Sequence, residues 1–265
     1  MLSFSLLKIL IFFSAWIILW LPIAIPLSKR IDYQFRSVPT VEQKLILIAS
    51  LYPLAPIIMG LIIHWSDISW LNIGWQWQAK ELFFLGWGII LAIGSLTVVF
   101  FVEFVCGLID WHKENSLKLV SLIFPVFCLS IGISFVEELI FRGFLISELN
   151  NNFSYLVSAI ASSTIFALLH LVWEQKKTIP QLPGLWLMGM ILVLGTITLE
   201  GNIGLAWGLH TGWIFGLTCL DGAELISYNT DSKNWLTGIN REPLAGLFGI
   251  LCLLLTGIVL LVVNF

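Results

Sequence analysis

The sequence predicts an all-α, polytopic integral membrane protein with about eight transmembrane helices in one bundle. Of its 265 residues, 58% are hydrophobic and only 11% are charged, whereas a soluble domain carries about 25% charged residues. The hydrophobic residues gather into runs of about 20, the length that a helix needs to cross a bilayer. No repeat or linker divides the chain, so we expect a single domain over residues 1–265.

Eight apolar runs are expected to cross the membrane. They cover residues 6–27, 45–63, 82–108, 119–149, 153–171, 182–199, 203–220 and 244–263. The first run is long for a signal peptide and lacks a small-residue cleavage pattern, so it is interpreted as a transmembrane helix. The second run contains Pro53 and Pro56, and a helix in a bundle can accommodate these prolines as a kink.

The connections between the runs are polar. Asn150-Asn151-Asn152 ends the fourth run, and Glu200-Gly201-Asn202 makes a tight turn after the sixth. Residues 64–81 mix tryptophan with polar side chains, which is typical of a segment at the membrane surface. Tryptophans at the edges of the runs indicate interfacial belts, and they are Trp65, Trp70, Trp75, Trp77, Trp111 and Trp173.

The seven loops between successive apolar runs are numbered in chain order. Lysine and arginine are concentrated in the odd-numbered loops, which follow the first, third, fifth and seventh runs. These loops contain Lys29, Arg30, Arg36, Lys44, Lys113, Lys118, Lys176, Lys177, Lys233 and Arg241, whereas only Lys8, Lys80 and Arg142 fall elsewhere. The positive-inside rule therefore places the odd loops in the cytoplasm and both termini outside. We expect a multi-pass protein of the cell (plasma) membrane in contact with membrane lipids. The cations form no basic face, so nucleic-acid binding is not expected.

The stretch from Phe135 to Gly143 places three charged residues inside an apolar run. They are Glu137, Glu138 and Arg142, and each ionisable group at membrane depth costs about 2.5–3.5 kcal/mol even on lenient insertion scales. In a helix, Glu138 and Arg142 stand at i and i+4 and can neutralise each other, whereas Glu137 is rotated by about 100° and has no local cation. Glu137 therefore suits a general base. The alternative is a structural ion pair between two helices.

Two histidines also lie in apolar surroundings. His170 ends the fifth run, and His210 lies in the middle of the seventh. The fourth and fifth runs form a helical hairpin, and a rise of about 1.5 Å per residue places Glu137 and His170 at comparable depth. We therefore favour one polar site that contains Glu137, His170 and His210. Glu103 lies near the end of its run and is at most a candidate for the surroundings of that site.

The residue types limit the chemistry of this site. The sequence contains no Gly-x-Ser-x-Gly motif and no His-Glu-x-x-His motif, which argues against a serine hydrolase and an ordinary zincin. A glutamate that takes a proton from water, beside imidazoles that orient the water or stabilise an oxyanion, fits amide hydrolysis. Two histidines and one glutamate can also hold a zinc ion with an open position. The residues alone leave both alternatives open.

These residues resemble the motifs of the CPBP family of intramembrane proteases, also called the Abi or CAAX protease family. The Glu-Glu-x-x-x-Arg motif of the family matches residues 137–142, and its Phe-x-x-x-His motif matches Phe166 to His170. Its third motif, His-x-x-x-Asn, matches only at His210, because Ile214 stands where the family usually has asparagine.

The resemblance covers residues 119 to about 220 well. The CPBP-like core is therefore expected over about 119–264, and the N-terminal spans in residues 1–118 are recognisable only as membrane segments. The resemblance implies an eight-helix intramembrane endopeptidase whose site opens towards the cytoplasm. Its substrate would be a peptide or a lipid-modified protein, for example a prenylated one.

The resemblance also implies roles for the motif residues. Glu137 would activate the attacking water with the help of His170, and Glu138 and Arg142 would support the site. His210 would help to stabilise the oxyanion. A glutamate mechanism without a metal cofactor is favoured, and a zinc-dependent variant of the same hydrolysis is the alternative.

Ile214 is the main departure from the family pattern. Isoleucine donates no hydrogen bond, and loss of one oxyanion donor lowers a rate by about 10²–10³. Trp213 and Thr211 are candidate replacement donors, whereas Phe166 is expected to pack rather than react. Without a replacement donor, the enzyme would be slow or inactive, and Ile214 favours the alternative of a non-catalytic membrane scaffold or chaperone. A proton-coupled transporter is disfavoured because the sequence lacks matching broken helices of inverted repeats.

Overall fold

The computed structural model describes residues 3–34, 37–66, 68–76, 78–229 and 235–263, and it is 80% helical. Its α-helices are α1 (Phe4–Arg30), α2 (Val41–Leu51), α3 (Leu54–Trp65), α4 (Ala79–Val105), α5 (Ser116–Glu138), α6 (Ile146–Asn150), α7 (Tyr155–Leu169), α8 (Gln175–Thr178), α9 (Leu182–Ile197), α10 (Gly204–Gly222) and α11 (Leu247–Val262). The π-helical segment is η3 (Leu139–Leu145), and the 3-10 helices are η1 (Trp70–Ile73), η2 (Lys113–Asn115), η4 (His170–Val172), η5 (Ile179–Gln181), η6 (Ile239–Arg241) and η7 (Pro243–Ala245). The two strands are β1 (Ile109–Trp111) and β2 (Ile226–Tyr228). The prediction of an all-α polytopic membrane protein is confirmed.

Six helical stretches of the described chain are long and apolar enough to cross a membrane. They are Phe4–Arg30, Val41–Trp65, Ala79–Val105, Lys113–Asn150, Tyr155–Val172 and Gln175–Ile197, and Leu247–Val262 is a shorter apolar helix. The predicted count of eight spans is therefore not confirmed. Helix α10 accounts for part of the difference, because its glycines, tryptophans, threonines and histidine make it less apolar than a lipid-facing span.

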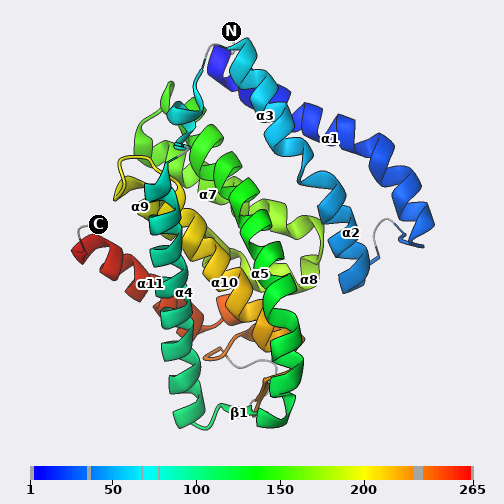
Figure 1. The fold of residues 1–265 in the computed structure, drawn as a ribbon, viewed down its shortest axis with the longest axis vertical. Coiled ribbons are helices and arrows are strands. Elements are labelled where there is room, and N and C mark those ends of the chain that lie inside the picture. The colour runs from blue at the N-terminus through cyan, green and yellow to red at the C-terminus, as the bar shows by residue number, and fades with distance from the viewer. Residues whose placement is uncertain (1–2, 35–36, 67, 77, 230–234, 264–265) are drawn as a thin grey trace.

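Helix α10 lies at the centre of the bundle, where it packs against α4, α5 and α9 (Figure 1). Two glycines allow α10 to approach α4 closely. A Cβ atom at Gly88 would lie 2.4 Å from the carbonyl oxygen of Leu205, and one at Gly208 would lie 2.2 Å from that of Leu85. Small residues at such contacts let membrane helices pack backbone to backbone. The first half of α10, which includes His210, is consequently buried.

Helices α1, α2 and α3 form a layer at one side of the bundle (Figure 1). Helix α1 packs on α2 and α3, and it joins the bundle at α6. There Nζ of Lys8 lies 2.5 Å from Oε1 of Glu148 in a buried ion pair, and Nδ2 of Asn151 donates to Oγ of Ser5 at 3.1 Å. The charge of Lys8 is therefore neutralised where α1 meets the bundle.

The second predicted span is kinked, as expected from its prolines. Helix α2 ends at Leu51 and α3 begins at Leu54, so that Tyr52 and Pro53 form the junction. Proline has no backbone N–H to continue the hydrogen-bond pattern of α2. The junction turns the chain beside the bundle and presents the side chain of Tyr52 to its interior.

The fourth predicted span is one helical path that runs from α5 through η3 to α6. Its π-helical part begins directly after Glu138, and such turns are rare and frequently lie at functional sites. Gly143 permits close packing here, because a Cβ atom at this position would lie 2.5 Å from the carbonyl oxygen of Ile73.

The odd-numbered loops meet at one end of the molecule. Strand β1 of the third loop pairs antiparallel with β2 of the seventh, and Lys118 lies 2.6 Å from Glu224. The prediction of plain polar loops missed this sheet because each strand has only three residues. Arg36 and Lys233, which contributed to the charge distribution, and Trp77 of the expected interfacial segment lie outside the described residues. The cytoplasmic location of this end and the plasma-membrane assignment stay predictions.

Candidate active site

Glu138 is the centre of a buried charged cluster. Its Oε1 atom accepts hydrogen bonds from Nη1 of Arg142 at 2.9 Å and from Nδ1 of His210 at 2.6 Å. The predicted i,i+4 pair of Glu138 and Arg142 is therefore present. Arg142 also donates from Nη2 to the carbonyl oxygen of Gly189 at 3.3 Å. Because all three charged or titratable side chains are buried, each depends on the others for its polar contacts.

Glu137 faces a different environment from its neighbour. Its side chain keeps 11% of its surface exposed, and it lines a large cavity. Its Oε1 atom accepts a hydrogen bond from the hydroxyl group of Tyr52, and its Oε2 atom lies 3.6 Å from Nε2 of His210. His210 therefore lies between the two carboxylates and turns one ring nitrogen towards each.

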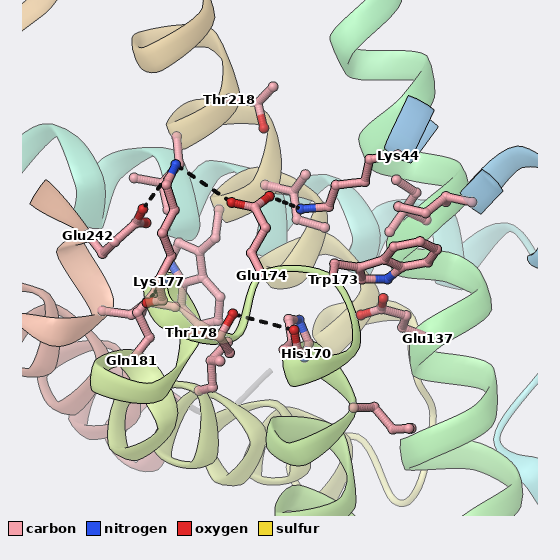
Figure 2. Close-up of a pocket in the computed structure, with 18 of the residues that line it drawn as sticks. Lys44, Glu137, His170, Trp173, Glu174, Lys177, Thr178, Gln181, Thr218 and Glu242 are labelled. Atoms are coloured by element: carbon pink, nitrogen blue, oxygen red, sulfur yellow. Dashed lines mark hydrogen bonds and ion pairs between the residues drawn. The ribbon is translucent and has the colours of Figure 1, made fainter. Parts of the chain in front are cut away.

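His170 lies at the end of α7 and lines the same cavity as Glu137 (Figure 2). Its Nδ1 atom is 2.8 Å from the carbonyl oxygen of Phe166. A carbonyl oxygen only accepts hydrogen bonds, so Nδ1 carries a proton, and in the neutral form of the ring Nε2 is the unprotonated nitrogen. The structure thus brings Glu137, His170 and His210 to one place, as the sequence predicted.

Phe166 packs beneath these polar groups. Its ring is fully buried, and its centroid lies 4.7 Å from that of His170 and 5.8 Å from that of His210. The guanidinium carbon of Arg142 lies 4.5 Å from the same centroid, within the range of a cation–π contact. Phe166 therefore holds both imidazoles and the arginine in place by packing.

A cavity of about 910 Å³ opens from Glu137 towards the end that carries the odd loops. Its walls are mainly apolar and come from α1, α2, α4, α5, α9 and α10; they include Trp16, Ile48 and Met188. A volume of several hundred Å³ suits a ligand pocket. The cavity is therefore large enough for a peptide segment beside the carboxylate.

Charged residues surround the mouth of this cavity, with Lys44 on α2, Lys177 on α8 and Glu174 and Glu242 outside the helices (Figure 2). Lys44 lies 3.0 Å from Glu174, and Lys177 lies 3.6 Å from Glu174 and 3.9 Å from Glu242. Burial acts to raise the pKa of Glu174, but the contacts with Lys44 and Lys177 outweigh it and lower that pKa overall. Burial raises the pKa of Glu242, and Lys177 offsets only part of this effect.

The two candidate replacement donors have other partners. Trp213 lines the cavity, but its Nε1 atom donates to Oγ of Ser95 at 3.2 Å. The hydroxyl group of Thr211 is fully buried and donates to the carbonyl oxygen of Trp207 at 2.8 Å. Ile214 lines the cavity with an apolar side chain. The hydrogen atoms of Trp213 and Thr211 are thus engaged on the surrounding helices.

Tyr52 is the site residue that the sequence reasoning missed. It lies 85 positions before Glu137, and no motif includes it. The available signal was the prediction of a proline kink at Pro53, since a kinked span can turn an adjacent polar side chain inward. Glu103 is buried and is not among the residues that line the cavity.

The described residues contain no group of three or more His, Cys, Asp and Glu side chains arranged to hold a metal ion. Nδ1 of His170 contacts a backbone carbonyl oxygen, and Nδ1 of His210 contacts Glu138, which leaves the Nε2 atom of each ring without these contacts. The absence of a metal cofactor stays a prediction, and the zinc-dependent variant of the hydrolysis stays its alternative.

Fold and site together define a multi-pass membrane protein with a buried carboxylate–imidazole centre that opens into a large cavity. Residues 118–216 match the family model described as type II CAAX prenyl endopeptidase Rce1-like. The matched stretch contains every residue of the motifs in α5, η3, α7, η4 and α10. The resemblance to the CPBP family is thereby confirmed over this stretch, and it supports a peptide hydrolase of the CAAX-protease type. Searches of curated proteins and of solved structures gave no match.

Proposed function

We propose that this protein is an intramembrane endopeptidase in which Glu137 activates water to hydrolyse a peptide bond near the cytoplasmic membrane face. The observation that carries the proposal is the placement of Glu137 and His170 in the wall of one cavity. A carboxylate and the unprotonated Nε2 atom of an imidazole can hold a water molecule between them as acceptors. The family match supports the same class of reaction.

The proposed reaction begins when this water loses a proton to the carboxylate of Glu137. Its oxygen bonds to the carbonyl carbon of the peptide, and the π electrons of the carbonyl group move to the carbonyl oxygen. When this tetrahedral intermediate collapses, the C–N bond breaks and Glu137 returns its proton to the leaving nitrogen. The products are a carboxylic acid and an amine, so the water is consumed and the enzyme is unchanged.

The buried cluster supports this chemistry electrostatically. Glu138 and Arg142 balance each other, and Glu138 holds Nδ1 of His210 at 2.6 Å. The protonated form of His210 donates from both nitrogens, so its Nε2–H can be presented to the negative charge that develops in the cavity. Fixed donors that point to a developing negative charge stabilise it strongly.

The proposed substrate is a peptide or a lipid-modified, for example prenylated, protein within the membrane. The cavity combines apolar walls, formed in part by Trp16 and Trp20 of α1, with a charged mouth. Apolar walls suit lipid-like groups and hydrophobic side chains, while a polar mouth remains compatible with a hydrated peptide. Membrane lipids are the expected neighbours of the exposed apolar helix surfaces.

Two alternatives make different predictions. A scaffold or chaperone of the same family would keep the fold without hydrolysing a peptide, and Ile214 is the residue that favours it. A zinc-dependent variant would lose activity on treatment with a metal chelator. Both are distinguished from the proposed mechanism by activity measurements on purified protein.

The test of the proposal is hydrolysis of a library of quenched peptides, including prenylated CAAX-type peptides, by the protein in detergent. Wild type is compared with Glu137→Gln and with Glu42→Gln, which removes an exposed carboxylate at the start of α2. We expect wild type and Glu42→Gln to cleave alike and Glu137→Gln to lose about 10²–10⁴ in rate. In heavy-oxygen water, one labelled oxygen should enter the new carboxyl group.

Cleavage by Glu137→Gln at the wild-type rate would contradict the proposed base. Absence of cleavage by wild type, while a known prenyl endopeptidase cleaves the same library, would favour the scaffold.

A further inference from the structure

Tyr52 connects the α1–α3 layer to the proposed base. It follows the last residue of α2 and precedes Pro53, and its hydroxyl group donates to Oε1 of Glu137. Its ring packs edge-on against Trp16, with 6.3 Å between centroids, and Nε1 of Trp16 donates to the carbonyl oxygen of Leu51 at 2.9 Å. The ring is therefore held at a fixed position in the cavity wall.

The proposed hydrolysis needs a hydrogen-bond donor for the negative oxygen of the tetrahedral intermediate, besides His210. Position 214 supplies none, and the polar hydrogens of Trp213 and Thr211 are engaged with Ser95 and with the backbone of Trp207. The hydroxyl group of Tyr52, by contrast, points at the carboxylate beside which the reaction would take place.

We propose that Tyr52 is a catalytic residue whose hydroxyl group donates a hydrogen bond to the oxyanion formed during peptide hydrolysis. This inference rests on the proposed function and adds a donor to it. In this role Tyr52 contacts the reacting oxygen itself, which is more than positioning Glu137.

The physical basis is a change of acceptor during the reaction. Before the water is activated, Glu137 is a carboxylate and is a strong acceptor for the Tyr52 hydroxyl group. Once Glu137 has taken the proton, it is neutral, and hydrogen bonds to charged groups are roughly twice as strong as those between neutral groups. The negative charge has by then moved to the substrate oxygen. Rotation about the Cζ–O bond lets the hydroxyl group follow it, and Tyr52 gives up no proton.

The first test is Tyr52→Phe, which removes one oxygen and keeps the ring on Trp16. We expect kcat to fall by about 10²–10³ while KM stays within about threefold, because the interaction exists only in the transition state. Tyr155→Phe is the matched control, since Tyr155 is exposed at the start of α7 and does not line the cavity. It should keep the wild-type rate. Retention of at least a third of the wild-type kcat by Tyr52→Phe would overturn the proposal.

The second test separates a donor from a positioning residue by rescue. Position 214 lies one turn after His210 on α10 and lines the cavity, so Ile214→Asn introduces an amide donor there. In the Tyr52→Phe background we expect Ile214→Asn to restore kcat at least about tenfold, a recovery within the range that one oxyanion donor provides. A double variant as slow as Tyr52→Phe would show that Tyr52 only positions Glu137, and the proposal would be wrong.

The thermal unfolding of each variant is recorded beside its kinetics. If Tyr52→Phe fails to fold, ring-fluorinated tyrosine at position 52 provides the same test, because it keeps the hydroxyl group and makes it a stronger donor. The rate should then follow the acidity of the phenol, and an unchanged rate would overturn the proposal. Wild-type protein that cleaves no peptide contradicts the proposed function itself, which distinguishes that failure from failure of the Tyr52 assignment.

Discussion

The two adjacent glutamates lie in two different regions of the molecule. Glu138 is fully buried, and its Oε1 atom binds both Arg142 and His210. Glu137 is in the cavity wall, where it contacts Tyr52 and faces His210 from the other side. Side chains of the same type, separated by about 100° around one helix, thus belong to a closed ionic cluster and to an open site.

The comparison of the two glutamates explains how a charged motif is tolerated inside a membrane protein. The closed cluster neutralises its charges with one another, because a buried charge without a partner is strongly unfavourable. The cavity-facing carboxylate is left accessible for chemistry. Substitutions in the two regions should therefore separate loss of stability from loss of reactivity.

Glu138→Gln should affect folding most. The variant leaves Arg142 buried beside a neutral amide, and breaking a buried pair in this way costs about 3–5 kcal/mol. Unfolding in detergent, followed by circular dichroism, measures the loss. Glu137→Gln is the comparison, and we expect it to lose less than about 1 kcal/mol because its side chain faces the cavity. Equal stability of the two variants would show that Glu137 and Glu138 contribute equally to folding, which contradicts the proposed difference between the two regions.

His170→Gln should affect catalysis but not folding. It removes the imidazole that faces the cavity beside Glu137, and loss of a group that assists proton transfer typically lowers a rate by about 10²–10⁴. Peptide hydrolysis measures the effect. His64→Gln, at the exposed end of α3, serves as control and should keep the wild-type rate. A fully active His170→Gln variant would show that His170 does not take part in catalysis, which would then depend on Glu137 and its other neighbours.

Lys44→Gln should have a small and pH-dependent effect at the cavity mouth. Partly exposed ion pairs contribute about 0.2–1 kcal/mol. Because the pKa of Glu174 is lowered in the folded protein, the bridge stabilises the fold above the pKa of an unfolded glutamate, about 4.3, and is lost as the pH falls through the lower folded value. The difference in unfolding between Lys44→Gln and wild type should therefore be present at pH 7 and decrease as the pH falls below about 4.3. A difference that stays constant as the pH falls would show that packing, not charge, stabilises the mouth of the cavity.

The sequence predicted much of the fold because membrane spans leave a strong signal in composition. Runs of apolar residues gave the helices, and Pro53 predicted the kink between α2 and α3. The number of spans was less accessible, because α10 is surrounded by protein and need not be as apolar as a lipid-facing helix. The small sheet of β1 and β2 was not predicted, since three-residue strands carry almost no pattern.

In the site, contacts between residues that are close in sequence could be predicted, whereas contacts between distant segments could not. The pair of Glu138 and Arg142 follows from helix geometry alone, and the common depth of Glu137 and His170 follows from counting along a hairpin. The contact of Tyr52 with Glu137 could not be predicted, because it depends on how the α1–α3 layer folds against the bundle. The position of His210 between two carboxylates likewise required the rotation of α10.

Activation of water by Glu137 is tested most directly by the rate of peptide hydrolysis by wild type and Glu137→Gln, each before and after exhaustive treatment with a metal chelator. We expect wild type to keep its rate in the chelator, and Glu137→Gln to be slow under both conditions. A wild-type rate that is lost to the chelator and restored by added zinc would contradict the glutamate mechanism, and so would full activity of Glu137→Gln.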